Sequence, residues 1–260
     1  MQYSSKLSVC TVTYNSQDKI GTAVASIKKH TKGVDYKYFI FDNGSTDNTK
    51  QVALSADENV IFHENGKNLG FGKANNLILP IMDSKYLAIV NPDIKVDSDV
   101  LSELCLYLDT HDDVSMATPK ILFPDGKEQI LPKRKPKLSY LLGRRLPILK
   151  KRVKEYTMED FCIKEPLEVE FITGCFVVIR AEVFKKLSGF DDRFFMYFED
   201  ADLTLRAKEY GKTVFLPQFH VIHEWERSSA KSFKYLMIHI SSMFKFLWKH
   251  RKYKSEVKKK

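Results

Sequence analysis

Apolar runs alternate with helical periodicities along the first half of the chain. Residues 7–13, 38–41, 60–62 and 86–90 are short apolar runs without polar alternation, as expected for strands covered on both faces. A stretch with helical apolar spacing follows each run, the last of them near residues 98–110. Four such alternations predict an α/β fold, with a doubly wound, mostly parallel sheet that binds a ligand at its strand ends.

Polar segments follow the first three predicted strands. Ser16 comes directly before the first helical stretch and is a candidate N-cap. Residues 42–47 form a dense turn signal, and Ser45 or Thr46 could cap the helix behind it. Residues 65–72 hold three glycines in a polar loop, which would let backbone N–H groups approach an anion.

The fourth predicted strand ends at Asn91-Pro92-Asp93. Pro92 has no N–H and cannot continue a central strand, so the chain turns there. Asp93 would therefore lie at the carboxyl end of a central strand, where it could supply an oxygen ligand to a divalent cation. A plain turn residue after proline is the alternative interpretation.

Residues 119–166 differ from the rest because they hold six of the nine prolines and much of the basic charge. We expect a long loop with one short basic helix at residues 138–154. Leucines interleave with Lys and Arg there, which favours a membrane surface over a purely solvated face.

The second half returns to regular structure at residues 168–180, read as one strand in which Gly174 allows close approach. A short helix is expected at residues 181–187. The apolar segment 194–198 then leads into the acidic start of a helix at residues 199–202. Carboxylates suit a helix N-terminus through the dipole alone. Partly buried, they would have raised pKa values and include a candidate general base.

The last predicted strand covers residues 212–217, and His220 and His223 follow it. His223 is a candidate metal or phosphate ligand, although a structural role is commoner for a lone histidine. Residues 233–248 form an apolar helical stripe that ends in a lysine-rich tail. This amphipathic helix could pack on the body, lie at a membrane interface or form a homodimer face.

Composition limits the class of protein. The 260 residues, 43% of them hydrophobic, can bury a large core in one or two domains. The four cysteines show no metal-binding spacing, which favours a reducing compartment. We expect no signal peptide and no spanning helix, hence a cytoplasmic protein. The cysteines are Cys10, Cys105, Cys162 and Cys175.

The net charge of +9 is unevenly distributed. Residues 127–154 carry eleven Lys and Arg against one acidic residue, and residues 245–260 carry eight against one. The rest of the chain is mildly acidic. Basic segments of this kind suit nucleic acid or an anionic membrane face, and plain solubility is the third explanation.

A nucleotidyltransferase and a nucleic-acid-binding domain are two alternative classes of protein. A sugar-phosphate nucleotidyltransferase would want a glycine-rich basic loop after the first strand, where the chain has Thr13-Tyr14-Asn15-Ser16. A non-catalytic nucleic-acid-binding domain would leave Asp42, Asp93 and Asp200 unexplained, because an acidic cleft repels phosphates. We therefore expect no nucleic-acid partner.

Taken together, the motifs resemble a family 2 glycosyltransferase with the Rossmann-like GT-A fold, of the rhamnosyltransferase-like kind. The resemblance covers residues 7–225, and no single motif carries it. The motifs are Val12-Thr13-Tyr14-Asn15, the segment 42–47, Asn68-Leu69-Gly70-Phe71-Gly72, Asn91-Pro92-Asp93, Thr173-Gly174 and Glu199-Asp200-Ala201-Asp202-Leu203.

The resemblance implies a role for each matching residue. Asp42 would accept from the imide N–H of a uracil or thymine base, and Asp93 and His223 would hold Mg²⁺ or Mn²⁺. Asp200 would be the base, with Glu199 beside it. Donor-binding residues would be Thr13, Tyr14, Asn15, Asp42, Asn43, Asn68, Gly70, Phe71, Gly72 and Asn91, and acceptor-binding residues Thr173, Gly174 and Asp202. Asn91 stands where many relatives have Asp, which leaves the metal's identity open.

The chemistry follows from these parts. A metal would offset the charge of the departing nucleoside diphosphate, and one carboxylate base would activate the acceptor hydroxyl. One base without a separate nucleophile predicts inversion at the anomeric carbon. The resemblance favours dTDP-rhamnose, with UDP-hexoses open, and a growing lipid-linked cell-surface polysaccharide as acceptor. The enzyme would then sit on the inner face of the cell membrane.

The expected organisation has two parts. Residues 1–225 would form the GT-A domain, and residues 226–260 the amphipathic helix and basic tail. Within the domain we expect a nucleotide-sugar-binding half at 1–118, a basic insertion at 119–166 and an acceptor and catalytic half at 167–225.

Overall fold

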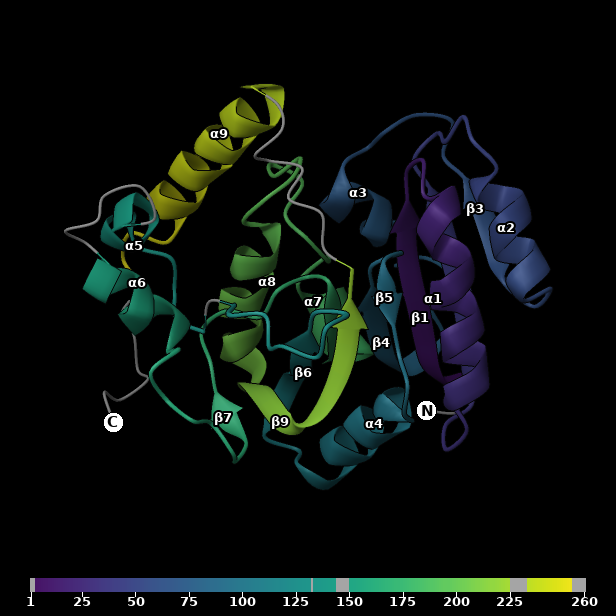
Figure 1. Cartoon of the computed structure of the whole chain (residues 1–260), viewed down its shortest axis with the longest axis horizontal. Helices are drawn as coiled ribbons and strands as arrows, with labels where there is room; N and C mark the ends of the chain where they lie inside the picture. The colour runs from purple at the N-terminus through teal and green to yellow at the C-terminus, as the bar shows by residue number, and fades with distance from the viewer. Residues whose placement is uncertain (1–2, 132, 144–149, 225–232, 254–260) are drawn as a thin grey trace.

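The computed structural model describes residues 3–131, 133–143, 150–224 and 233–253 (Figure 1). Its centre is a nine-stranded mixed sheet in the order β3-β2-β1-β4-β8-β6-β9-β5, with β7 paired to β9. Helices cover both faces of this sheet, which confirms the predicted α/β architecture (Figure 1).

The N-terminal half is the parallel part of the sheet. β1 pairs with β2 and β4, and β2 pairs with β3, all in parallel. This confirms the predicted strand–helix alternation. The elements are β1 (Ser5–Thr13), α1 (Gln17–His30), β2 (Tyr36–Asp42), α2 (Thr49–Ala56), β3 (Ile61–Glu64), α3 (Phe71–Asn76), β4 (Ser84–Val90) and α4 (Val100–Thr110).

The second half adds the antiparallel part. β8 runs antiparallel between β4 and β6, and β9 runs parallel to β6. The strands are β5 (Ile94–Lys95), β6 (Val114–Leu122), β7 (Leu167–Glu168), β8 (Phe176–Arg180) and β9 (Lys212–His223). The helices are α5 (Leu138–Gly143), α6 (Lys150–Thr157), α7 (Ala181–Lys186), α8 (Glu199–Ala207), the 3₁₀ turn η2 (Lys208–Tyr210) and α9 (Phe233–Lys249).

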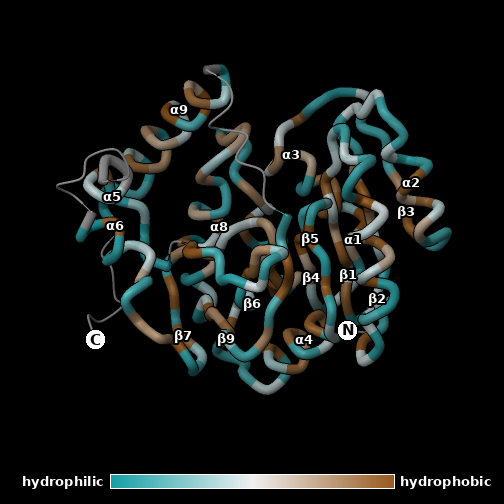
Figure 2. Tube along the Cα trace, viewed as in Figure 1, coloured by the Kyte–Doolittle hydropathy of each residue, from teal (hydrophilic) through white to brown (hydrophobic). Residues whose placement is uncertain are grey.

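Successive strand residues point into two different cores. In β2, Tyr38 and Ile40 pack with α1 and α4 on one face, whereas Phe39 and Phe41 pack with α3, α7 and α8 on the other. Figure 2 shows hydrophobic positions gathered along the central strands, as burial on both faces requires.

Several local predictions were wrong. Residues 168–180 are not one strand, because residues 169–175 bond to other segments; for example, the Ile172 N–H donates to Thr204 Oγ1 at 3.1 Å. The interpretation of residues 119–166 missed that β6 runs to Leu122, and the last strand extends to His223. The basic helix is described as α5 and α6, since residues 144–149 lie outside the described part.

The helix-cap predictions also failed in detail. Ser16 occupies the N-cap position of α1, but its Oγ accepts from the Tyr14 N–H at 3.2 Å instead of capping the helix. Asn48 holds the N-cap position of α2, because Ser45 is used by Asp42.

Helix α9 packs on the body with one of its faces. Phe246 is fully buried in a third cluster that includes Phe194, Phe198 and Leu205. The predicted boundary at residues 225–226 and the tail at 254–260 lie outside the described residues. Among the helices that the structure describes, none is long and apolar enough to cross a membrane.

Candidate active site

The carboxyl ends of β1 and β2 meet at one edge of the sheet, where Thr13 and Asp42 are in register. Asp42 is buried and accepts four hydrogen bonds. Its Oδ1 accepts from Thr13 Oγ1 at 2.7 Å and Ser45 Oγ at 2.5 Å, and its Oδ2 accepts from the N–H groups of Gly44 at 3.1 Å and Ser45 at 2.8 Å. A base that binds Asp42 must replace one of these bonds.

Asn43 connects the loop after β2 to the glycine loop. It is buried, and its Nδ2 donates to the Gly70 carbonyl at 3.1 Å. Its Oδ1 accepts from Asn65 Nδ2 at 3.0 Å. These contacts make Asn43 a support for the 65–70 loop rather than a group that faces solvent.

Tyr14 and Asn15 form the rim beside Asp42. Tyr14 is 50% exposed, so its ring is open to a ligand. Asn15 has a positive φ of 50°, and its Oδ1 accepts from the Thr46 N–H at 2.9 Å. The rim is therefore held by the 42–47 loop.

The glycine loop packs against the second half of the domain. The N–H of Gly70 donates to Asn68 Oδ1 at 2.9 Å, and that of Phe71 donates to the Phe195 carbonyl at 3.1 Å. Gly70 has a φ of +84°, and a Cβ there would lie 2.3 Å from the Phe195 oxygen. A Cβ on Gly72 would lie 2.9 Å from Phe190 Cβ. Here glycine allows two chain segments to touch, so the expected approach of these two N–H groups to a phosphate is not what the loop displays.

Asp93 and His223 meet although 130 positions separate them. β5 pairs antiparallel with the end of β9, so Ile94 faces His223. Asp93 Oδ1 consequently lies 3.3 Å from His223 Nε2. Both atoms are buried, and neither has a hydrogen-bond partner among the described residues. Two facing, unpartnered lone-pair atoms are the arrangement that a bound cation would satisfy.

The protein contributes few ligands to this candidate site. Within the described ranges, no cluster of three His, Cys, Asp or Glu side chains could hold a metal by itself. A cation at Asp93 and His223 would therefore need further oxygen ligands from a substrate or water. The Asn91 N–H donates to the Cys175 carbonyl at 2.8 Å, which anchors this turn to the chain segment before β8.

The acidic start of α8 carries the base candidates. Asp200 Oδ2 accepts from the Gly174 N–H at 3.1 Å, and Oδ1 accepts from the Ala201 N–H at 2.8 Å. Burial raises the pKa of Asp200 to about 6, with these backbone bonds opposing part of the rise. Burial, and then the charge of Asp200, raises the pKa of Glu199 well above its ordinary value. Near neutral pH Asp200 is therefore mostly ionised, and the raised pKa of Glu199 disfavours a second charge beside it.

Cys175 lies between the two acidic centres. Burial raises the pKa of its thiol to about 12, and the charges of Asp93 and Asp200 both add to that rise. Gly174 contacts Asp200, while the Cys175 carbonyl contacts Asn91. Residues 174–175 thus contact both the base candidate and the turn that carries the metal candidate, and Thr173 precedes them in a partly exposed position.

Asp202 lies elsewhere. Its carboxylate is fully buried, forms ion pairs with Arg206 at 2.7 Å and Lys249 at 2.5 Å, and is hydrogen-bonded to His250 Nε2 at 2.7 Å. Burial alone would raise the pKa of Asp202, but the His250 hydrogen bond and the Arg206 and Lys249 charges outweigh it and lower the pKa. This arrangement argues against the expected contact with an acceptor and makes Asp202 an anchor for α9.

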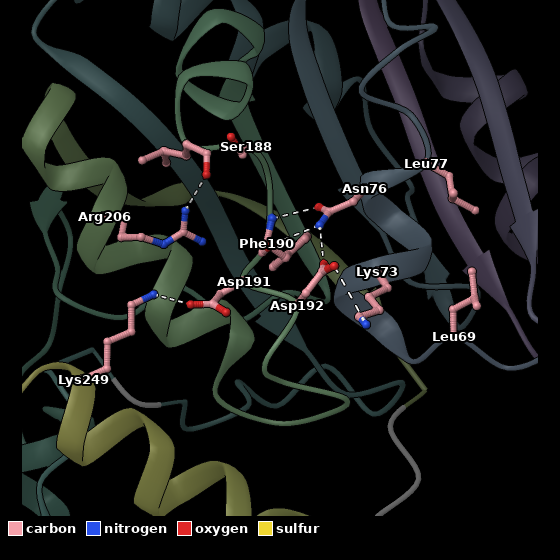
Figure 3. Close-up of a pocket in the computed structure, with 11 residues that line it drawn as sticks. Leu69, Lys73, Asn76, Leu77, Ser188, Phe190, Asp191, Asp192, Arg206 and Lys249 are labelled. Atoms are coloured by element: carbon pink, nitrogen blue, oxygen red, sulfur yellow. Dashed lines mark hydrogen bonds and ion pairs between the residues drawn. The ribbon is translucent and has the colours of Figure 1, made fainter.

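A separate pocket of about 690 Å³ lies beside α3 (Figure 3). Its charged side chains are engaged in ion pairs, such as Lys249 with Asp191 at 2.6 Å and Lys73 with Asp192 at 3.8 Å. None of the predicted site residues lines it.

Sequence reasoning missed Gln129, which is buried beside His223. The Asp125-Gly126 turn was an available signal, since such a dipeptide after an apolar run predicts a hairpin return. The chain does turn there, and Glu128 bridges back to Leu122.

The mixed sheet with helices on both faces is a GT-A glycosyltransferase fold, as the matching solved structures show. The structure of Staphylococcus aureus TarS residues 1–349 with UDP-GlcNAc superposes with a TM-score of 0.67 at 16% identity, over 96% of this chain and 68% of that one. The mannosyltransferase PcManGT from Pyrobaculum calidifontis, in complex with GDP-Man and Mn²⁺, gives 0.67 at 13% identity, over 98% and 66%.

The chain belongs to glycosyl transferase family 2, whose family model matches residues 8–188. Among its relatives, an N-acetylglucosaminyl-diphospho-decaprenol L-rhamnosyltransferase of Mycobacterium tuberculosis is 28% identical over 93% of this chain and 83% of its own length. The rhamnosyltransferase WbbL of Escherichia coli K12 is 27% identical over 83% of both chains. Membership of this family favours the transferase hypothesis over the nucleotidyltransferase and nucleic-acid hypotheses.

Proposed function

We propose that this chain is an inverting, metal-dependent glycosyltransferase that moves a sugar from a nucleoside diphosphate sugar to a hydroxyl of a lipid-linked glycan. The observation that carries the proposal is that residues 174–175 contact Asp200 and also Asn91, which stands at the turn of the Asp93–His223 pair. A transferase of this type needs these two centres, one for the diphosphate and one for the attacking hydroxyl.

Asp200 is the proposed base. Its pKa of about 6 leaves it ionised at neutral pH and still basic enough to accept the proton of the acceptor hydroxyl. The bonds from Gly174 and Ala201 hold the carboxylate in one orientation. The proposed mechanism uses Asp200 as its single base and no separate nucleophile, so direct displacement would invert the anomeric centre.

Asp93 and His223 are the proposed metal ligands, with Asn91 at the same turn. When bound there, Mg²⁺ or Mn²⁺ would act as a Lewis acid that offsets the charge of the leaving diphosphate. The unpartnered Asp93 Oδ1 and His223 Nε2 support this assignment, and the residue pair leaves coordination positions for diphosphate oxygens.

The proposed donor is dTDP-rhamnose, with UDP-hexoses as the alternatives. Two relatives at 27–28% identity carry the name rhamnosyltransferase, which supports rhamnose as the sugar. Asp42 would recognise the imide N–H of thymine or uracil by exchanging one of its four internal hydrogen bonds. Tyr14, half exposed at the rim, would cover the base or ribose.

A lipid-linked acceptor would require the enzyme to bind the inner face of the membrane, and α9 offers a surface for this. On α9, Met237, Phe244 and Trp248 are 49%, 60% and 64% exposed and lie on one helical face, away from Phe246. Residues 233–253 contain five Lys and Arg and no acidic residue. An exposed apolar stripe with basic neighbours fits an anionic lipid surface, with Trp248 at headgroup level.

The basic insertion at residues 119–166 supports the proposed membrane-facing surface. Lys135 Nζ donates to the carbonyls of His250 at 2.6 Å and Tyr253 at 3.3 Å, which holds the insertion against the end of α9. Figure 1 shows α5 and α6 beside this end of α9. The two basic segments seen in the sequence would therefore act on one membrane surface.

Calorimetric titration of the full chain with dTDP, UDP and GDP, with and without Mn²⁺, tests the donor site. We expect metal-dependent binding of dTDP or UDP that is lost in Asp93→Ala and weakened in Asp42→Ala. Asp97→Ala is the matched control, because Asp97 forms an exposed pair with His220 at 3.1 Å. Absence of nucleotide binding by the wild-type chain under all conditions would overturn the proposal.

Two further measurements test the acceptor side. NMR of the product linkage must show an inverted anomeric configuration. Flotation with anionic vesicles must show binding that falls at least tenfold when Met237, Phe244 and Trp248 become serine, since each large apolar side chain contributes about 1.5–3 kcal/mol. Leu106→Ser, 54% exposed on α4, is the control. Self-association without vesicle binding would instead make this stripe a homodimer face.

A further inference from the structure

Gln129 occupies a buried position at the ends of the paired strands β6 and β9, with 2% of its surface exposed. Its Nε2 donates to the His223 carbonyl at 2.8 Å and to the Leu122 carbonyl at 3.3 Å. Turning the amide over would place Oε1 against two carbonyl oxygens, which can only accept. The two strand carbonyls therefore determine which way the amide faces.

This orientation determines what His223 can present. Gln129 Oε1 lies 3.1 Å from His223 Nδ1 and can only accept, so Nδ1 carries a hydrogen. In a neutral imidazole the other nitrogen, Nε2, then has a free lone pair. That nitrogen is the one that lies 3.3 Å from Asp93 Oδ1 without a hydrogen-bond partner in the described structure.

We infer that Gln129 is a positioning residue that holds His223 as the Nδ1–H tautomer, with its bare Nε2 aimed at the cation position beside Asp93. The inference rests on the metal-dependent transfer proposed above. A second-shell partner on the far nitrogen sets the tautomer and the ring angle of a ligating histidine. One side chain thereby connects the backbone of both strands to one metal ligand.

The neighbouring histidine on β9 provides an internal comparison. His220 also lies beside a carboxylate, Asp97, but its Nε2 is hydrogen-bonded to Asp97 Oδ2 at 3.3 Å and its side chain is 39% exposed. His223 is 7% exposed and is held through both its carbonyl and its Nδ1. Burial together with a directed amide distinguishes the candidate ligand from the surface pair.

The first test is ¹⁵N NMR of histidine-labelled, metal-free protein at alkaline pH, with the His223 signals identified by His223→Gln. We expect the Nδ1–H tautomer in the wild type and loss of that preference in Gln129→Met, which keeps the length but removes the amide. An Nε2–H ring at His223 in the wild type would overturn the inference, whatever the outcome for transfer activity.

The second test is the affinity for Mn²⁺ alone, followed by electron paramagnetic resonance. We expect Gln129→Met to weaken binding about 10–100-fold, the usual effect of removing an outer-shell partner. Gln129→Glu can accept from Nδ1 but cannot donate to the two carbonyls, and should rescue the tautomer without full affinity. Thr118→Val is the control, because it removes a buried 2.8 Å bond from Thr118 on β6 to the Phe176 carbonyl on β8.

These readouts separate the two proposals. If the wild type does not bind Mn²⁺, the proposed metal dependence is wrong, but NMR can still determine the tautomer of His223. Unchanged Mn²⁺ affinity and an unchanged tautomer in Gln129→Met would overturn the role of Gln129 alone. Equal losses in Thr118→Val and Gln129→Met would assign the effect to general destabilisation and also overturn it.

Discussion

The backbone N–H of Gly174 donates a 3.1 Å hydrogen bond to Asp200 Oδ2, so a glycine before β8 orients the carboxylate at the start of α8. A Cβ at Gly174 would lie 3.1 Å from Phe71 Cε1 and 3.4 Å from Asp200 Cβ. The position is thus crowded by the donor loop on one side and by the base on the other. Gly174, Phe71 and Asp200, which belong to three separate motifs, therefore pack against one another here.

Gly174→Ala should lower kcat about tenfold while the Kd for the nucleotide changes little. The added methyl pushes on Phe71 and Asp200, and loss of one well-oriented bond to a charged group costs about 1.5–3 kcal/mol. Steady-state kinetics and nucleotide titration on the same preparation provide the measurement. Gly21→Ala is the control, because its Cβ would be crowded by Val52 at 2.9 Å, away from the site. A loss of nucleotide affinity larger than the loss of kcat would contradict this role.

The pH profile should report Asp200. A base must be ionised, so kcat/KM should fall about tenfold per pH unit below the raised pKa of about 6 and level off above it. Asp200→Asn should lose about 10²–10⁴ in kcat, the usual contribution of a general base. Its residual activity should lack the acidic limb. An unchanged acidic limb in that variant would assign the ionisation to another group.

The same carboxylate should cost the folded protein stability at neutral pH. Its folded pKa, about 6, lies above the ordinary 3.8, so the folded state binds more protons in that interval and stability falls as pH rises through it. Asp200→Asn should therefore be more stable than the wild type above about pH 6, by up to about 3 kcal/mol, and equal to it in acid. Urea unfolding at both ends of the interval measures this. Asp97→Asn, on the surface, should show no such gain.

The hydrophobic and polar pattern predicted those features that depend on neighbouring residues in the sequence. Apolar runs without alternation predicted β1, β2 and β4, because only strands covered on both faces combine these residues. The acids after the 194–198 segment were expected to be partly buried with a raised pKa, and Asp200 has one. Pro92 marked the turn that presents Asp93.

The pattern could not predict pairings that depend on distant segments. His223 reaches Asp93 because two-residue β5 pairs with the end of β9, and a strand that short has no sequence signal. Asp202 matches an acidic motif, yet His250, 48 residues away, is hydrogen-bonded to it and Lys249 forms an ion pair with it. The spacing of Gly70 and Gly72 predicts a phosphate loop, but it carries no sign of the close contacts with Phe195 and Phe190 that also favour glycine there.

Asp202 should stabilise the docking of α9. Its pKa is lowered because the hydrogen bond from His250 and the charges of Arg206 and Lys249 outweigh the effect of burial. A lowered folded pKa means that this stabilisation is present above the ordinary value of 3.8 and is lost as pH falls below it. Asp202→Asn should destabilise the protein by about 3–5 kcal/mol at neutral pH, because it leaves buried cations uncompensated.

Lys249→Met is the informative partner variant, because it removes one cation and leaves Asp202 paired with Arg206 and His250. It should cost less than Asp202→Asn, and the double variant should cost less than the sum of the two, since the second change relieves part of the charge left by the first. Urea unfolding gives each free energy, and limited proteolysis of α9 reports its release. Additive costs with α9 still protected would show that Phe246 and its apolar neighbours hold the helix without these ion pairs.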